Sequence, residues 1–401
     1  MPTELFQWTL QHTDRASQAR AGVLQTPHGV IMTPVFMPVG TQATVKTLTS
    51  AEVAEVGAQI ILGNTYHLFL RPGDEILARF GGLHRFMNWH RPILTDSGGF
   101  QVWSLSERRT IDEDGVNFRS HLDGSTHRFT PERAMAIQSR IGADIVMAFD
   151  ECSSYGVTHE YAAAAMERTH RWLERCVRAR EREDQALFGI VQGNLYADLR
   201  ERSAAFVGAQ PVQGFGIGGL SVGEPKAEMY SMLSTTTAAL PADRPRYLMG
   251  VGAPEDLIEC IGRGVDMFDC VLPTRLGRHA SAFTPEGRIN LLNAQWASDA
   301  EPIQAGCDCQ TCRNYSRAYI RHLFRAGETL GPRLATVHNL RFLIRLMEHA
   351  RAAILEGRFA DFSQEFLAAY RAAPRGDRPA RRAVREPQIE SSQPYLSIAK
   401  G

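Results

Sequence analysis

The chain has 401 residues, 44% of them hydrophobic, which is enough for one large domain or two medium ones with a substantial core. Its 44 lysines and arginines balance its 44 aspartates and glutamates, so the net charge argues neither for nor against a nucleic-acid partner, and any basic surface must be local. The N-terminus lacks the pattern of a secretion signal, and no apolar run approaches the roughly 18 residues of a membrane span. Seven cysteines, an odd number, are typical of a reducing compartment. We therefore expect a soluble cytoplasmic protein with no membrane partner.

The first part of the chain predicts a barrel. Residues 4–31 read as an irregular entry or a hairpin with Pro27-His28-Gly29 as its turn, and apolar runs separated by helical patterns follow. Eight runs are expected to be buried strands: 33–40, 58–63, 93–99, 144–150, 186–193, 214–220, 246–252 and 265–272. Eight strands alternating with helices predict an α/β fold, a (β/α)8 TIM barrel, whose usual size is about 250 residues. The alternative is a doubly wound open sheet, but no Gly-rich fingerprint opens a helix after the first strand.

Polar residues and glycines lie at the ends of five of these expected strands. They are Asp96, Asp150, Gln192, Gly219 and Asp269. In a TIM barrel the carboxyl ends of all strands meet at one face, where the reacting groups lie. Carboxylates and amides accept N–H donors and glycine N–H groups donate to a carbonyl, which fits a flat heterocycle such as guanine. Two carboxylates around one anomeric carbon also suit glycosyl transfer, one attacking and the other handling protons. The residues alone leave open which carboxylate does which.

A cluster of cysteines indicates a metal site. Residues 307–312 form C-x-C-x-x-C, with His322 and His338 as candidates for a fourth ligand. Three thiolates and one imidazole make a closed tetrahedral zinc site, which is structural rather than catalytic. A catalytic zinc hydrolase is a poorer interpretation, because no H-x-H lies at the strand ends and H-E-x-x-H is absent from the sequence.

The cysteine cluster also bears on the domain organisation. We expect a catalytic barrel over residues 1–292, with an entry segment and a hairpin insertion at 101–129 that contains two Asp-Gly turns. A zinc-binding helical subdomain over 293–372 and a disordered basic tail over 373–401 are expected to follow. Arginines recur every fourth residue from Arg313 to Arg325, and they form either a solvated helix face or a local track for phosphates.

Several stretches together resemble the bacterial tRNA-guanine transglycosylases, also called queuine tRNA-ribosyltransferases. They are Thr33–Gly40, Gly63–Leu68, Asp96–Gln101, Phe268–Arg275 and the C-x-C-x-x-C with its distant histidine. The similarity runs from about residue 4 to residue 372. It implies a TIM barrel with an inserted zinc subdomain and a pentosyltransferase of tRNA processing. Such an enzyme replaces guanine at the wobble position of tRNA with a 7-deazaguanine in queuosine biosynthesis, by double displacement through a covalent enzyme–RNA intermediate.

The resemblance also implies roles for single residues. Asp269 matches the nucleophile and Asp96 the general acid/base. Residues matching the base-binding set are Asp150, Gln192, Gly219, Phe100, Met249, Cys152 and Val222. Residues matching the RNA-binding loop are Thr274, Arg275, Gly277 and Arg278. The ligands of one structural Zn²⁺ per subunit match Cys307, Cys309, Cys312 and His338, which decides against His322.

Two positions bear on which base enters the site. Val222 and Cys152 both resemble the bacterial form, which favours 7-aminomethyl-7-deazaguanine over the bulkier queuine. Phe100 stands where some relatives have Tyr, a change that keeps the stacking surface. The family further implies a homodimer. Two other interpretations are a non-catalytic zinc-stabilised RNA-binding protein or accessory subunit, which would not need Asp269, and an enzyme that acts on DNA.

Overall fold

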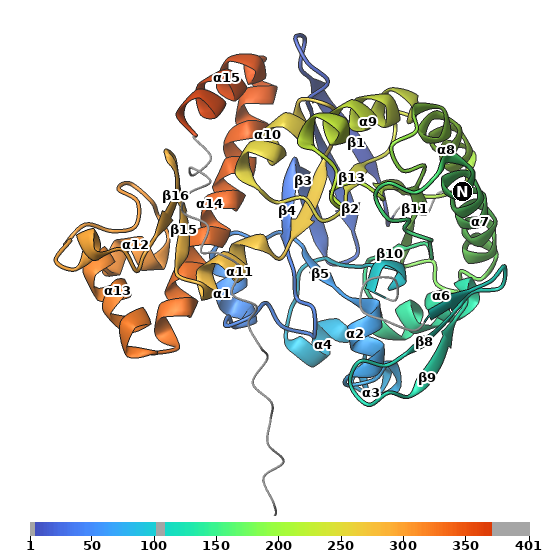
Figure 1. Ribbon diagram of the computed structural model, residues 1–401, viewed down its shortest axis with the longest axis horizontal. Coiled ribbons are helices and arrows are strands. Elements are labelled where there is room, and N and C mark those ends of the chain that lie inside the picture. Colours follow the sequence, from blue (N-terminus) through green and yellow to red (C-terminus); the bar gives the residue numbers. More distant parts are fainter. Residues whose placement is uncertain (1–4, 102–108, 371–401) are drawn as a thin grey trace, which may run out of the picture.

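The computed structural model describes residues 5–101 and 109–370 (Figure 1), and the predicted basic tail at 373–401 lies outside them. Eight parallel strands form the central sheet, one in each of the predicted apolar runs. They are β4 (Val35–Pro38), β5 (Ile61–Gly63), β6 (Ile93–Thr95), β10 (Ile145–Met147), β11 (Ala186–Val191), β12 (Gly214–Ile217), β13 (Arg246–Leu248) and β14 (Met267–Cys270).

The sheet closes on itself. Its strand order is β4-β14-β13-β12-β11-β10-β6-β5, and a parallel bridge between Val39 and Leu62 joins the two edge strands. Side chains alternate along the strands, so that Ile145 and Met147 of β10 belong to the inner core while Val146 packs beneath the outer helices. The predicted TIM barrel is confirmed.

Helices surround the barrel, as Figure 1 shows. They are α1 (Ser50–Glu55), α2 (Thr65–Leu70), α3 (Asp74–Arg79), α4 (Leu83–Met87), α6 (Pro131–Ile141), α7 (His159–Arg178), α8 (Ala197–Ala209), α9 (Lys226–Ala239), α10 (Pro254–Ile261) and α11 (Leu272–Arg278). The start of α6 shows why the sequence forms a helix there. The Thr130 side chain accepts a hydrogen bond from the Arg133 N–H, and Pro131 occupies the first turn, where it costs no hydrogen bond.

A three-stranded antiparallel sheet covers the end of the barrel at which the strands begin. It consists of β1 (Trp8–Thr13), β2 (Arg20–Thr26) and β3 (Gly29–Thr33), with β2 in the middle. Leu24 and Ile31 of this sheet join the inner core of the barrel. Arg20 forms a buried salt bridge with Asp266, which immediately precedes the β14 region. This end of the barrel is therefore closed, and a ligand must enter at the opposite end.

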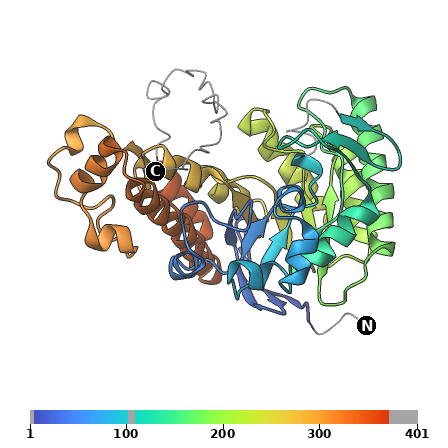
Figure 2. The same ribbon diagram turned by 90° about the horizontal axis from the view of Figure 1, so that it is seen from below.

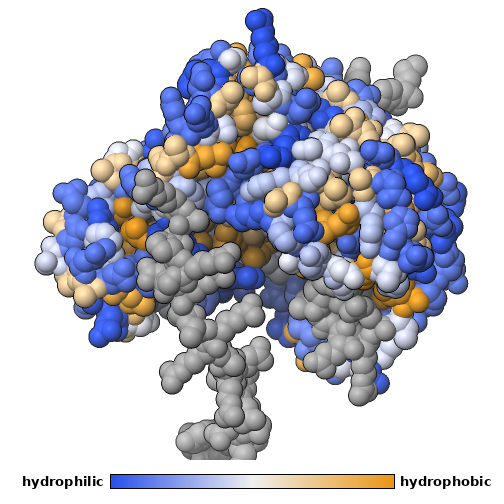
Figure 3. Space-filling view, turned by 45° about the horizontal axis from the view of Figure 1, so that its top comes forward, coloured by the Kyte–Doolittle hydropathy of each residue, from blue (hydrophilic) through white to orange (hydrophobic). Residues whose placement is uncertain are grey.

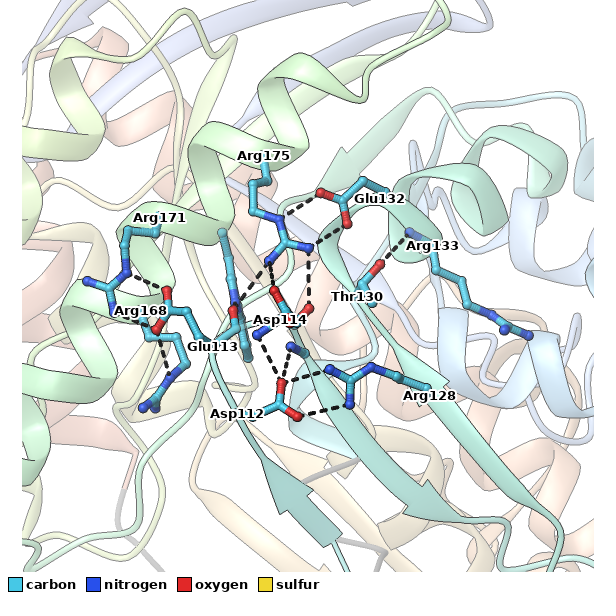
Figure 4. A network of polar contacts seen from close by, with 12 residues as sticks. Asp112, Glu113, Asp114, Arg128, Thr130, Glu132, Arg133, Arg168, Arg171 and Arg175 are labelled. Atoms are coloured by element: carbon cyan, nitrogen blue, oxygen red, sulfur yellow. Dashed lines mark hydrogen bonds and ion pairs between the residues drawn. The ribbon is translucent and has the colours of Figure 1, made fainter.

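A second antiparallel sheet follows β6. It contains β7 (Arg109–Ile111), β8 (Val116–Arg119) and β9 (Thr126–Phe129), while residues 102–108 of the predicted insertion lie outside the described part of the chain. Figure 4 shows how its acidic turn is fixed to arginines of α7. The Arg171 guanidinium contacts the Glu113 carboxylate at 2.5 and 2.9 Å, and Arg175 binds both oxygens of Glu132 at 2.7 Å. The Arg171–Glu113 pair therefore joins the sheet to α7, whereas the Arg175–Glu132 pair joins α7 to the start of α6.

The C-terminal part lies to one side of the barrel (Figure 2). It comprises β15 (Ser281–Thr284), β16 (Gly287–Asn290), the 3₁₀ turn η1 (Ala294–Trp296), α12 (Gln310–Asn314), α13 (Arg317–Ala326), α14 (Leu330–Leu355) and α15 (Phe359–Ala369). Helix α14 is central, because it contacts α11, α12, α13, β15 and the barrel strand β4. The domain boundaries at residues 292 and 372 stay a prediction.

The face of the molecule drawn in Figure 3 is mostly hydrophilic, with hydrophobic residues in small separate groups. None of the helices in the described ranges is both long and apolar enough to cross a membrane.

Candidate active site

A cavity of about 280 Å³ lies at the carboxyl ends of the barrel strands. Its wall contains all nine residues that the sequence predicted for catalysis and base binding: Asp96, Phe100, Asp150, Cys152, Gln192, Gly219, Val222, Met249 and Asp269. They come from loops or strand ends that are far apart in the sequence and meet only because the strands are parallel. The expectation that these strand ends converge therefore agrees with the structure, while their individual roles are a separate question.

Asp269 lies on β14 and is half-buried. The Tyr247 hydroxyl donates a hydrogen bond to its Oδ1 at 2.6 Å, and the Gly250 N–H donates to the same oxygen at 2.7 Å. Burial raises the pKa of Asp269 above its usual value, and these two hydrogen bonds oppose that effect by favouring the anion. Both donors use Oδ1, and within the described residues no hydrogen bond to Oδ2 is found. This geometry orients the carboxylate and keeps one oxygen available for reaction.

Asp96 follows β6 and is buried. The Thr65 N–H donates to its Oδ1 at 2.8 Å, and the Asn64 side-chain amide donates to Oδ2. Burial raises the pKa of Asp96 to about 7, because the hydrogen bonds from Thr65 and Asn64 offset only part of the desolvation, and the nearby charge of Asp269 raises it further. A carboxyl group with such a pKa is populated in both protonation states at neutral pH, so it can serve as acid and base in turn.

Asp150 and Gln192 form a polar wall of the cavity. The Ser97 hydroxyl donates to Asp150 Oδ1 at 2.9 Å, and the Gln192 amide donates to Oδ2 at 2.8 Å. The Gln192 Oε1 atom is buried and accepts no hydrogen bond from any described residue. It lies against Gly219, where an added Cβ would be only 2.4 Å from this oxygen and where φ is +65°, so glycine is required. The wall thus offers carboxylate and amide oxygens to a ligand with N–H groups.

The predicted metal ligands also lie together. The sulfur atoms of Cys307, Cys309 and Cys312 are 3.7, 3.8 and 3.2 Å from His338 Nδ1, and all four residues are buried. A tetrahedral zinc ion with bonds of about 2.3 Å to sulfur and 2.0 Å to nitrogen would place these atoms about 3.5 Å apart. The other ring nitrogen of His338 is 2.7 Å from the Phe283 carbonyl oxygen, which fixes Nδ1 toward the sulfurs. This cluster can therefore bind a metal ion.

A second group of potential ligands lies at the opposite, amino-terminal end of the strands. The Asp144 carboxylate contacts His28 Nδ1 at 2.7 Å, His84 Nε2 at 3.1 Å and the Ile93 N–H at 2.8 Å. The two imidazole rings are stacked, with centroids 3.7 Å apart and planes 15° apart. Lone pairs lie in the ring planes, so two stacked rings cannot both point at one ion. We interpret this group as a hydrogen-bonded clamp rather than a metal site.

Comparison with known proteins decides the family. A family model described as queuine tRNA-ribosyltransferase matches residues 14–372. The chain belongs to the queuine tRNA-ribosyltransferase family. Relatives with this name include a protein of Herpetosiphon aurantiacus, 63% identical over 380 residues that cover 95% of this chain and 96% of the relative. Others are from Symbiobacterium thermophilum, 59% identical with 94% of each chain covered, and Pelotomaculum thermopropionicum, 57% identical with 90% of this chain and 98% of the relative covered. The predicted family is confirmed.

Four residues that hold the carboxylates of this family member were not singled out from the sequence. They are Asn64, Thr65, Ser97 and Tyr247. Asn64 directly follows β5, so the rule that strand ends carry chemistry could have found it. Tyr247 is only 1% exposed inside β13 and looks like an ordinary core residue in the sequence. No sequence signal distinguishes its hydroxyl from that of a packed tyrosine.

The residues that match the family's RNA-binding loop lie on α11, directly after Asp269 and Cys270. Arg275 is exposed, Arg278 is half-buried, and Thr274 and Gly277 are buried. At Gly277 a Cβ would lie 2.6 Å from the Thr336 hydroxyl oxygen and 2.8 Å from its backbone nitrogen, so glycine permits close packing of α11 on α14. Of these four residues, the arginines are therefore the ones that can offer charge to a phosphate.

The predicted arginine stripe is partly neutralised within the protein. Arg317 forms a 2.9 Å ion pair with Asp299 and lies over the Trp296 ring. Arg321 donates to the main-chain carbonyls of Leu292 and Asn293. Both arginines thus fix the segment that precedes the cysteine cluster, which favours a structural role for this part of the stripe.

Proposed function

We propose that this protein exchanges the guanine at the wobble position of tRNA for a 7-deazaguanine base. Membership of the queuine tRNA-ribosyltransferase family supports a pentosyltransferase of queuosine biosynthesis that acts on tRNA. The observation that carries the proposal is the pair of carboxyl groups in one cavity, in which Asp96 has a pKa of about 7 and Asp269 is held by Tyr247 and Gly250. A pair so arranged supplies the nucleophile and the acid/base that glycosyl exchange needs.

The reaction follows as a double displacement. Asp269 Oδ2 attacks the ribose C1′ while the bond from C1′ to guanine N9 breaks, and Asp96 in its protonated form gives a proton to the departing base. The RNA is then held as an ester on Asp269. The incoming 7-deazaguanine loses its N9 proton to the Asp96 carboxylate and attacks C1′, and the ester bond breaks to free Asp269. Two inversions give net retention, and the enzyme returns to its starting protonation state.

The polar wall accounts for recognition of the base. The Asp150 carboxylate accepts hydrogen bonds from the amidine-like edge of guanine, and the carbonyl edge accepts from the Gly219 backbone N–H and from the second N–H of the Gln192 side-chain amide, whose first donates to Asp150. Phe100 and Met249 enclose the ring from its two faces, as their place in the cavity wall allows. Val222 and Cys152 line the same cavity, and their match to the bacterial form supports 7-aminomethyl-7-deazaguanine over queuine.

The proposal also covers the bound metal ion, the surface that contacts RNA and the oligomeric state. Zinc is the proposed ion at the cysteine cluster, because three thiolates and one imidazole form a closed structural donor set. Arg275 and Arg278 with Thr274 and Gly277 form the proposed RNA contact on α11. The homodimer and the position of the hairpin insertion at the barrel mouth stay predictions. Size-exclusion chromatography coupled to light scattering would test the homodimer.

A covalent trapping experiment tests the function. The protein is mixed with an anticodon stem-loop RNA that carries guanine at the wobble position and with a base analogue that arrests the second step, and the mixture is run on a denaturing gel. We expect a shifted band for the wild type, and none for Asp269→Asn or for an RNA with adenine at that position. Asp256→Asn, which changes a buried aspartate outside the cavity, serves as the control and should give the band. A band that persists in Asp269→Asn would refute the assigned nucleophile, and no band with folded, zinc-loaded wild type would refute the exchange reaction.

A further inference from the structure

Arg200 is a fully buried cation behind the active-site cavity. It lies on α8, and its side chain has no exposed surface. Its guanidinium donates to four main-chain carbonyls: Gly218 at 2.7 Å, Asn194 at 2.8 Å, Gly219 at 3.1 Å and Val191 at 3.4 Å. Within the described ranges no carboxylate forms a salt bridge with it. Burying an unpaired charge costs free energy. An arginine at this position is therefore expected to have a role that a smaller, uncharged residue could not fill.

The four carbonyls belong to the two loops that carry base-binding residues. Val191 and Asn194 flank Gln192 and Gly193 at the end of β11, and Gly218 and Gly219 follow β12. Arg200 therefore bridges the loop of Gln192 to the loop of Gly219. A planar guanidinium can donate to several carbonyls at fixed angles, whereas the point charge of a lysine cannot hold two peptide planes in one orientation.

The orientation of these peptides determines what the cavity presents. In a trans peptide the N–H points opposite to the C=O. The Gly218 and Gly219 carbonyls point at Arg200, so the N–H groups of Gly219 and Leu220 point away from it. Gly219 and Leu220 line the cavity, whereas Arg200 is buried behind them. The two N–H groups are therefore turned to the cavity side, where a carbonyl oxygen of a flat base can accept from them.

We propose that Arg200 is a positioning residue for base recognition, which fixes the Gly218–Gly219 and Gly219–Leu220 peptides so that their N–H groups meet the carbonyl of the base. This inference rests on the proposed function, because the base is the ligand that the two N–H groups would bind. Arg200 touches neither the base nor the RNA in this account. Its loss should weaken base binding through the loops and leave the carboxylate pair of Asp96 and Asp269 in place.

Arg246 provides a matched control. It is also buried, burial lowers its pKa to about 10 as it does for Arg200, and it donates to main-chain carbonyls of Leu240 and Gly264. It lies at the first residue of β13, at the closed end of the barrel. A purely structural role of a buried arginine should thus give the same result at both positions.

The test compares Arg200→Lys, Arg200→Gln and Arg246→Lys with the wild type. We would measure the KM for guanine and kcat in guanine exchange into tRNA, the Kd for tRNA, and the melting temperature. For Arg200→Lys we expect a KM for guanine raised about tenfold or more, with kcat within about threefold and tRNA affinity within about twofold. For Arg246→Lys we expect a lower melting temperature with an unchanged KM for guanine. Partial restoration of the KM in folded Arg200→Gln by millimolar guanidinium would further support the assignment.

Three outcomes would overturn it. A KM for guanine within twofold of the wild type in folded Arg200→Lys removes the positioning role. An equal rise of KM in Arg246→Lys shows that any buried arginine would give the effect. Failure of both Arg200 variants to fold, while Arg246→Lys folds, makes Arg200 a determinant of the fold instead. Absence of guanine exchange by the wild type would refute the proposed function itself, which separates that failure from failure of the inference.

Discussion

Burial and hydrogen bonds act in opposite directions on the pKa values of Asp96 and Asp269, the two carboxyl groups proposed as catalytic, which lie in the same cavity. Burial raises the pKa of Asp96 to about 7, a value suited to proton transfer. Burial raises the pKa of Asp269 as well, but the Tyr247 hydroxyl and the Gly250 N–H stabilise its anion. In the proposed reaction, Asp96 does the acid/base work and Asp269, held as an anion by these two hydrogen bonds, is the nucleophile. The role of Tyr247 can be tested separately from that of Asp269.

Tyr247→Phe should slow exchange and shift its acid limit. The hydroxyl lowers the pKa of Asp269, so its removal raises that pKa, and the anion is lost at a higher pH as the solution is acidified. A hydrogen bond to a charged group contributes about 1.5–3 kcal/mol, which predicts a rate lower by roughly 10- to 100-fold. The pH dependence of kcat should show its acid limb moved upward. Tyr230→Phe is the control, since Tyr230 also donates to an aspartate, Asp256, outside the cavity. An unshifted limb in Tyr247→Phe would contradict this role.

Whole elements are fixed in place by polar contacts. The acidic turn between β7 and β8 is bound to arginines of α7 (Figure 4). At the closed end, Asp144 joins three elements: the β2–β3 turn through His28, α4 through His84, and β6 through Ile93. The burial cost of Asp144 is outweighed by these hydrogen bonds, which lower its pKa to about 2. The contacts at the closed end therefore make stability depend on pH.

His28→Ala should destabilise the protein most in mildly acidic solution. The hydrogen bond with Asp144 raises the pKa of His28 above 6.5, helped by the charges of Asp144 and Asp184 and opposed by burial and by the charge of Arg182. The stability that the His28–Asp144 hydrogen bond gives the folded state is therefore complete below about pH 6.5. It is lost as the pH rises through the higher pKa that His28 has in the folded protein. In more acidic solution, below about pH 4, the same stabilisation is lost because Asp144 becomes protonated. Melting temperatures at pH 4.5–9 should show the largest difference between wild type and variant at pH 4.5–6.5. His90→Ala, a change at an exposed histidine before β6, is the control and should show no such pH window. If the melting temperature of His28→Ala differed from that of the wild type by the same amount at every pH, the stabilising role of the His28–Asp144 contact would be refuted.

At the scale of the whole molecule, the sequence predicts those features that depend on local pattern. Eight barrel strands were predictable because strands buried on both faces are uninterrupted apolar runs, and the cysteine cluster was predictable from spacing. The first strand, Trp8–Thr13, was not, because it is mostly exposed and has no apolar run. Arg200 was also missed, since a cation on a helix normally faces solvent and only the tertiary contacts bury it. The carboxylate partner Tyr247 likewise lies inside another strand, so no local pattern reveals its role.

The cysteine cluster is linked through α14 to α11, the helix that follows Asp269. His338 and Asn339 are neighbours on α14. His338 faces the three cysteines, while the Asn339 amide donates to the carbonyls of Pro273 in α11 and Ser281 in β15. Helix α11 carries Arg275 and follows Asp269 directly. A metal ion held by the cluster would therefore stabilise the surface proposed to bind RNA, and none of the four cluster residues lines the base cavity.

Cys309→Ala should consequently separate RNA binding from base binding. We expect bound zinc, measured by mass spectrometry, to fall from one equivalent to near zero, because a closed site needs all four ligands. The Kd for tRNA should rise by about tenfold or more as α14 and α11 lose their anchor, with the Kd for guanine within about threefold of the wild type. Cys260→Ala, at a buried cysteine of α10, should keep the metal and both affinities. A zinc-free Cys309→Ala protein with unchanged tRNA affinity would show that the cluster does not support the RNA surface. Equal loss of guanine and tRNA binding would show instead that the metal stabilises the barrel as a whole.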